Sequence, residues 1–206
     1  LHDALPIAPF IDIPNFDMIN AFPIDYMHQV LLGVQRRLLS IWVNEKKRFG
    51  RLHTNSVNVI NDRLTKLSNQ APKELARKPR SLKHLFHFKA TEFRSFLLYT
   101  GKVVLKNMLT TDQYTHFLCL SIAITILSNT DMAKDYRQYA HELPLYFVSK
   151  MKSLYGEHHL VYDVHSLLHL AKQSEIYGDL NCCSAFDLRN TCKSLKNWSG
   201  KGRIRW

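Results

Sequence analysis

Residues 22–42 read FPIDYMHQVLLGVQRRLLSIW, and their large apolar side chains recur at steps of three and four. This spacing puts an apolar stripe on one side of a helix, because residues i, i+3 and i+4 share a helix face. Asp25 stands just before the stripe, where a carboxylate caps free amides and offsets the positive end of the helix dipole. The stretch therefore predicts a long helix that begins near Asp25. The apolar set is Met27, Val30, Leu31, Val34, Leu38, Ile41 and Trp42.

Further helices are predicted along the rest of the chain, and no alternating strand pattern of any length interrupts them. Residues 117–127 are apolar nearly all round, so this helix should form the buried centre. Residues 159–163 include β-branched and aromatic side chains and predict at most a short strand. The predicted fold is mostly α. The predicted helices cover about 54–67, 89–109 with a break or kink at Gly101, 112–127, 131–155, 164–177 and 185–198.

The chain is basic, and it has enough apolar residues to pack a core. Of its 206 residues 46% are hydrophobic, and 28 Lys and Arg against 17 Asp and Glu give a net charge of +11. Such a charge favours a nucleic-acid partner, because Lys and Arg displace counterions from phosphates. A basic surface with no polyanion partner is the alternative that charge alone leaves open. No membrane span is predicted, since the longest apolar run, 117–127, falls short of the roughly 20 residues needed.

Composition also divides the chain into segments. Prolines are dense before residue 24, which predicts extended backbone there. We expect residues 1–7 (LHDALPI) to be a leader that is not native, 8–23 to be an extended loop, 24–198 to be a helical domain and 199–206 to be a basic tail.

Histidines and cysteines are side chains that could ligate a metal in this sequence. His165 and His169 have the i, i+4 spacing of some zinc sites, but Ser166 stands where zinc hydrolases carry their catalytic Glu. A structural metal that also uses His158 and His159 is one alternative; we predict instead that these histidines cap and pack, with no metal site. The four cysteines contain no Cys-x-x-Cys pair, so neither a zinc ribbon nor a disulfide framework is predicted.

Three separated blocks carry motifs in a fixed order, and the first block is residues 22–42, quoted above. The second block is residues 77–101 (RKPRSLKHLFHFKATEFRSFLLYTG), and the third, 162–186 (YDVHSLLHLAKQSEIYGDLNCCSAF), contains His165 and His169. Together the blocks resemble the transposases of CACTA-type (En/Spm-like) DNA elements, which carry Asn in the place of Asp163. The first block matches their Asp-x-Met-His segment with its following Leu-Gly and Trp through Asp25, Met27, His28, Leu32, Gly33 and Trp42.

The resemblance implies a catalytic core of RNase H-like fold in the full-length parent. There two Asp and one Glu hold Mg²⁺, and two cations about 4 Å apart stabilise the attacking and leaving oxygens during transposon excision and integration. An all-helical insertion separates the second Asp from the Glu, and this chain would be mostly that insertion, with a fragment of the core at its edges. The resemblance further implies a nuclear protein that contacts transposon ends and forms homo-oligomers in the parent.

The catalytic acids of the family are not expected in this chain. The first two Asp should precede residue 1, and alignment of the family's Ser-Ala-Phe-Pro-Phe-Glu-Asn pattern with residues 184–190 places Arg189 at the position of the Glu. An arginine keeps its proton and cannot ligate Mg²⁺. We therefore expect a non-catalytic fragment that contributes scaffold and DNA backbone contacts. The alternative is a domesticated module, derived from a transposase, that binds DNA or another protein.

The stretch from Lys73 to Lys106 is the strongest candidate for a DNA-binding surface. It carries nine Lys or Arg against Glu74 and Glu92, with five aromatic residues interleaved. One interpretation is a surface that follows phosphates; the other is core aromatics beside a solvated basic face. The residues predicted to contact DNA are Arg36, Arg37, Arg77, Lys78, Arg80, Lys83 and Lys89.

Overall fold

The structure, a computed structural model, describes residues 13–14, 17, 22–44, 50–72 and 77–186. These residues form helices and connecting turns, with no strand in any of the described ranges, so the predicted mostly α fold is confirmed for this part of the chain. In chain order the elements are η1 (Met27–Gln35), α1 (Arg36–Asn44), α2 (Thr54–Gln70), η2 (Leu82–His87), α3 (Ala90–Ser95), η3 (Phe96–Thr100), α4 (Gly101–Val104), α5 (Thr111–Leu127), α6 (Thr130–Tyr155), η4 (Glu157–His159), α7 (Tyr162–Ser166), η5 (Leu167–His169) and α8 (Leu170–Tyr177).

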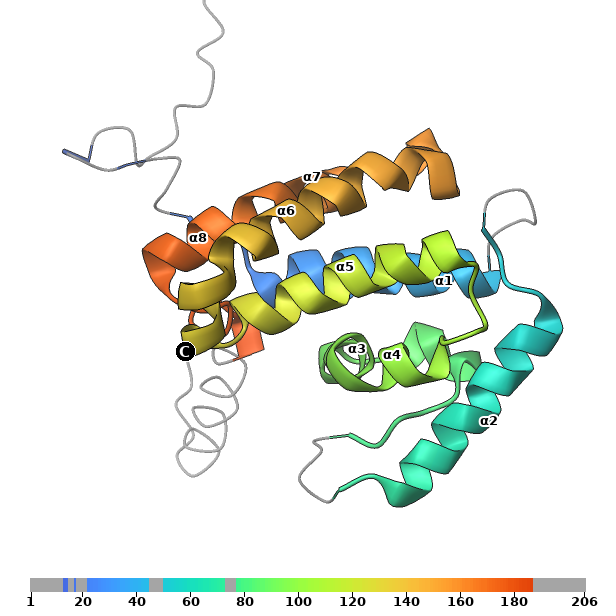
Figure 1. The fold of residues 1–206 in the computed structure, drawn as a ribbon. Helices are drawn as coiled ribbons and strands as arrows, with labels where there is room; N and C mark the ends of the chain where they lie inside the picture. The colour runs from blue at the N-terminus through green and yellow to red at the C-terminus, as the bar shows by residue number, and fades with distance from the viewer. Residues whose placement is uncertain (1–12, 15–16, 18–21, 45–49, 73–76, 187–206) are drawn as a thin grey trace, which may run out of the picture.

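The helices are arranged in three layers (Figure 1). An upper layer holds α6, α7 and α8, a middle layer holds α1 and α5, and a lower layer holds α2, α3 and α4. The middle layer separates the other two, so residues on α2–α4 and residues on α6–α8 form different faces of the molecule. No helix of the described residues combines the length and the apolar character that a bilayer span requires.

The predicted long helix is present as η1 followed without interruption by α1. The η1 segment is a π-helix, and Arg36 continues it in right-handed helical geometry. The Oδ1 atom of Asp25 accepts a hydrogen bond of 3.0 Å from the amide of Met27, which is the N-terminal cap that the sequence predicts. The whole predicted stripe is buried, and Val30, Leu31, Val34 and Leu38 are fully inaccessible.

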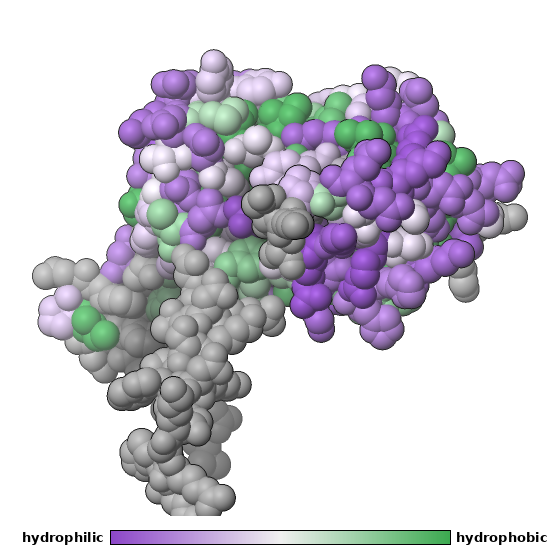
Figure 2. Space-filling model, turned by 90° about the horizontal axis from the view of Figure 1, so that it is seen from below, coloured by the Kyte–Doolittle hydropathy of each residue, from purple (hydrophilic) through white to green (hydrophobic). Residues whose placement is uncertain are grey.

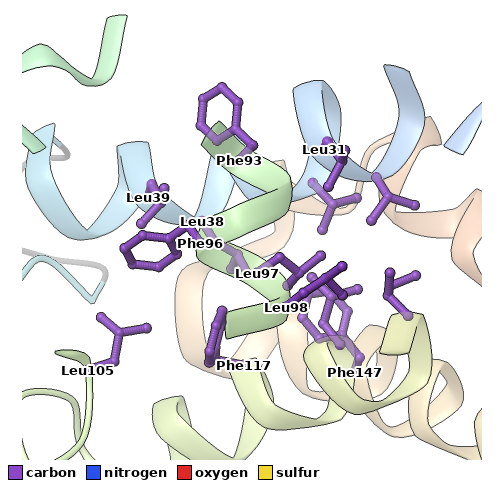
Figure 3. Packing of buried hydrophobic residues seen from close by; sticks show 14 of the residues in the cluster. Leu31, Leu38, Leu39, Phe93, Phe96, Leu97, Leu98, Leu105, Phe117 and Phe147 are labelled. Carbon is purple, nitrogen blue, oxygen red and sulfur yellow. The ribbon is translucent and has the colours of Figure 1, made fainter. Parts of the chain in front are cut away.

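Helix α5 is the buried centre, as predicted. Thr110 caps its start in a capping box with Gln113, so four local residues fix where it begins. Phe117 packs edge-on against Trp42 with ring centroids 5.9 Å apart, and the Ser121 hydroxyl donates to the carbonyl of Leu97 at 2.6 Å. Figure 3 shows this core, in which Phe96 and Leu97 lie between the middle and lower layers near Phe117.

The helix does not break at Gly101, where the sequence predicts a break or kink, but it changes there from a π-helix to an α-helix. Residues 90–104 form one helical run in which α3, η3 and α4 follow each other, and Gly101 has helical φ and ψ of −58° and −42°. A Cβ atom at this position would lie 2.6 Å from Cζ of Phe117. Glycine is therefore needed here because α5 approaches closely, and this cause cannot be read from the local sequence.

The predicted short strand over 159–163 is also wrong. Gly156, at φ 103°, ends α6, residues 157–159 form the 3₁₀ turn η4, and α7 already begins at Tyr162. Extended backbone is thereby limited to the short link between these turns, and a strand also needs a partner to receive its hydrogen bonds.

Two helix starts differ slightly from prediction, and some predicted segments lie outside the described residues. His53 and Asn129 cap α2 and α6, one and two residues before the predicted helices over 54–67 and 131–155 begin. Residues 1–7, most of the loop over 8–23, the tail over 199–206 and all but the first two residues of the helix over 185–198 lie outside the described residues.

Candidate functional site

The three motif blocks of the sequence meet at the start of η1. The carboxylate of Asp25, in the first block, accepts hydrogen bonds of 3.0 Å from the amides of both Met27 and Ala185, and its other oxygen pairs with the Nδ1 atom of His28. Because Ala185 belongs to the third block, Asp25 joins residues 160 positions apart in the chain. Asp25 and His28 form a polar cluster at a helix start, as predicted.

The second block joins the same place through Arg94. Its guanidinium donates to the side-chain oxygen of Asn181 at 2.8 Å and lies over the ring of Phe186, 5.7 Å from the centroid. Tyr26 is completely buried, and burial raises the pKa of its phenol to about 12 although the charge of Arg94 opposes the shift. We call Asp25, Tyr26, Arg94, Asn181 and Ala185 the junction.

The remaining motif residues are packing residues. A Cβ atom on Gly33 would lie 2.7 Å from an Oδ2 atom of Asp163, so glycine lets α7 pack closely on η1. Met27 and Trp42 are buried, and the indole of Trp42 donates to the hydroxyl of Tyr155 at 3.3 Å. Within the first motif, Met27 and Trp42 thus lie in the core, Leu32 packs against it, and the exposed ring of His28 pairs with Asp25 of the junction.

The described residues do not fit a metal site. His165 and His169 are exposed, with ring centroids 5.4 Å apart, and nowhere in the described ranges do three His, Cys, Asp or Glu side chains come together in a way that would hold an ion. Arg189, aligned with the family's Glu, lies outside the described residues. We therefore assign no step to Mg²⁺ in this part of the chain.

Comparison with known proteins leaves these features without a parallel. No family model, curated protein or solved structure matches the chain.

Charge is distributed unevenly between the layers. Within residues 50–110, which include the lower layer, the described residues contain eleven Lys or Arg and two acids, Asp62 and Glu92. Within residues 130–186, which include the upper layer, they contain five Lys or Arg and seven Asp or Glu. The lower face carries a broad hydrophilic area on the side where α2 lies (Figure 2). Among the described residues, the positive charge is therefore concentrated in the lower layer.

Four of the predicted DNA-binding residues are exposed at the lower layer. Arg77 and Lys78 precede η2, Lys83 lies in it and Lys89 follows it. No Asp or Glu among the described residues lies within ion-pair distance of these four side chains. Of the four, Arg77 acts on an acid at longer range, since its charge helps to lower the pKa of Glu92.

Arg80 differs from these four residues. Its guanidinium holds both oxygens of the buried Glu92, with Nε–Oε1 at 2.5 Å and Nη2–Oε2 at 2.8 Å, and it also donates to the carbonyl of His87. Burial opposes ionisation of Glu92, but Arg80 and the amide of Lys89 hold the pKa of Glu92 below its ordinary value. We therefore interpret Arg80 as a residue that fixes the loop before η2, although the sequence predicts a DNA contact.

The interleaved aromatic residues are divided between core and surface. Phe88, Phe93 and Phe96 are buried, whereas the side chains of Phe86 and Tyr99 are 82% and 63% exposed. Most of the aromatic residues therefore pack in the core, and two remain exposed; the surface that follows phosphates stays a prediction.

Arg36 and Arg37 lie at a different place from the other predicted DNA contacts. They line an open groove of about 480 Å³ together with Ser40, His158, His159 and Asp163. The groove lies between the η1–α1 helix and the η4–α7 turn, and it brings residues 36–40 together with residues 158–163. Sequence reasoning missed this grouping, since no motif or spacing connects the two segments.

Proposed function

We propose that this chain is the helical insertion region of a CACTA-type DNA transposase and that its lower layer binds the DNA backbone. The observation that carries DNA binding is the set of exposed cations, Arg77, Lys78, Lys83 and Lys89, none of which forms an ion pair with a described residue. Such side chains attract phosphates and release the counterions that phosphates hold.

Support for the family comes from the junction. The three blocks that carry the resemblance lie far apart in the chain, yet Asp25 bonds to Ala185 and Arg94 bonds to Asn181. Motif residues that share one contact network are expected if the blocks belong to one structural unit. The proposal includes a nuclear location, and it includes an RNase H-like parent whose own carboxylates bind Mg²⁺.

Binding through these residues should not depend on DNA sequence. Flexible lysines on loops and short helices meet phosphates, whereas base recognition needs side chains held rigidly in a groove. Each phosphate contact should add about −0.9 to the slope of log affinity against log salt on duplex DNA.

The test is the fluorescence anisotropy of a labelled duplex at several salt concentrations. Joint replacement of Arg77, Lys78 and Lys83 by Gln should make the salt slope shallower by about 2.7, if each side chain contacts one phosphate. The matched control replaces Lys134, Lys150 and Lys172, on α6 and α8, by Gln and removes the same charge. Equal losses from both triple variants would exclude a specific role for the lower layer. Absence of binding at low salt would instead favour a protein-interaction module.

A further inference from the structure

The groove beside α1 has the size of a small-ligand site. Its volume of about 480 Å³ lies within the range of roughly 300–1,000 Å³ that such sites occupy. Arg36, Arg37 and Ser40 line one wall from α1, and His158, His159 and Asp163 line the other from η4 and α7. These residues belong to the middle and upper layers, so the groove is separate from the basic lower layer.

The arginines of the groove lack an anionic partner in the described part of the chain. Neither Arg36 nor Arg37 forms an ion pair there, although Asp163 lines the same groove. The Nε atom of Arg37 is buried and has no hydrogen-bond acceptor among the described residues. A buried donor without a partner is costly, and a guanidinium is suited to bind a phosphate with two parallel hydrogen bonds.

Asp163 makes one end of the groove acidic, whereas Arg36 and Arg37 make the other end basic. Its carboxylate packs on Gly33, about one helical turn before Arg36 and Arg37. A carboxylate repels a phosphate but accepts hydrogen bonds from hydroxyl and amino groups. The ligand that fits both ends therefore carries a phosphate at one end and such donors a few ångströms away.

We infer that this groove binds one nucleotide, with its phosphate against Arg36 and Arg37 and its sugar or base donors against Asp163. The nucleotide can be a free mononucleotide or the 5′-phosphorylated end of a single strand, because both present the same groups. The inference does not rest on the proposed binding of duplex DNA, since it uses none of the lower-layer cations.

Isothermal titration calorimetry tests the inference with adenosine 5′-monophosphate, inorganic phosphate, adenosine and a 5′-phosphorylated oligonucleotide. The monophosphate should bind saturably, and Arg37→Gln should weaken it at least about tenfold, as loss of a charge-assisted hydrogen bond does. The control Arg51→Gln removes an exposed arginine outside the groove and should leave affinity unchanged. Asp163→Ala should weaken binding of the monophosphate but not of inorganic phosphate.

The outcomes separate the ligand sources and the two proposals. Tighter binding of the oligonucleotide than of the monophosphate would assign the groove to a strand end, and equal binding would assign it to the free nucleotide. No saturable binding of the monophosphate, equal binding of adenosine, or full affinity in Arg37→Gln would overturn the inference. If circular dichroism shows that Arg37→Gln is unfolded, Arg36→Gln, whose side chain is exposed, replaces it. Duplex binding should persist in Arg37→Gln, so either proposal can fail without the other.

Discussion

Replacement of Arg80 by Met should destabilise the fold and leave DNA binding almost intact. The change removes the guanidinium from Glu92 but keeps an apolar stem beside Phe88, over whose ring the guanidinium lies at 5.5 Å. The Glu92 side chain, only 4% exposed, would lose two charge-assisted hydrogen bonds and keep the one from Lys89.

The expected loss of unfolding free energy depends on the burial of Glu92 and the partial exposure of Arg80. Removal of one member of a fully buried ion pair costs about 3–5 kcal/mol. The Arg80 side chain is 40% exposed, so water screens part of this interaction, and we expect a loss of about 2–3 kcal/mol. Urea unfolding at pH 7 measures the loss, with Lys78→Met as the control that should change stability by less than about 0.5 kcal/mol.

The pH dependence provides a second test of the same pair. Because the pKa of Glu92 is lowered in the folded protein, its pairing contributes stability above the unfolded value of about 4.3. That contribution is lost as pH falls through the lower, folded pKa. The difference between the wild type and Arg80→Met should therefore shrink in acid. A difference that stays constant down to about pH 3, or an equal effect of Lys78→Met, would refute the assignment of Arg80 to the fold.

Three further changes test the junction and the core. Asp25→Ala should lower the free energy of unfolding by about 2 kcal/mol, because it removes a helix cap and leaves the amide of Ala185 without its acceptor. If the wild type bound stoichiometric zinc or magnesium and the Asp25→Ala variant did not, the view that Asp25 is structural would be contradicted. Gly33→Ala should also destabilise, since its Cβ would lie 2.7 Å from Oδ2 of Asp163, and Asp163→Ala should reduce the loss in a double-mutant cycle. His116 is buried, and burial lowers its pKa to about 4, so unfolded chains take up a proton that the folded protein does not. Stability should therefore fall by up to about 3 kcal/mol between pH 6.5 and pH 4, and His116→Phe should flatten this dependence in thermal unfolding.

Sequence was sufficient where local signals control the structure. The stripe from Met27 to Trp42 has helical spacing, and Thr110 with Gln113 forms a capping box within four residues, so the first helix and α5 were predictable. In the sequence Gly101 looks like a helix breaker. In the structure a glycine is needed there because the ring of Phe117 approaches it across the core. Val161 favours a strand by its own preference, yet the turn after Gly156 and the early start of α7 leave no room for one.

The candidate sites depend on contacts between distant segments. The composition of residues 73–106 predicts a basic surface, but whether Arg80 is available depends on Glu92, which the fold brings within hydrogen-bond distance. The groove depends on Arg37 and Asp163 lining the same space although more than a hundred residues separate them. Charge composition therefore predicts a basic surface, while the partner of each charge has to come from the tertiary structure.

The uneven charge of the two outer layers also gives the described part of the chain an electric dipole. Near a polyanion, a molecule with this asymmetry experiences a torque that turns its lower layer inward before any side chain makes contact. Salt limits the distance over which this acts, since the screening length is about 10 Å at 0.1 M. This orientation acts while the two molecules approach each other and not in the final complex. It therefore changes the association rate more than the dissociation rate. Moving a lysine from α2 to α6 would keep the net charge at +11 and still slow the approach.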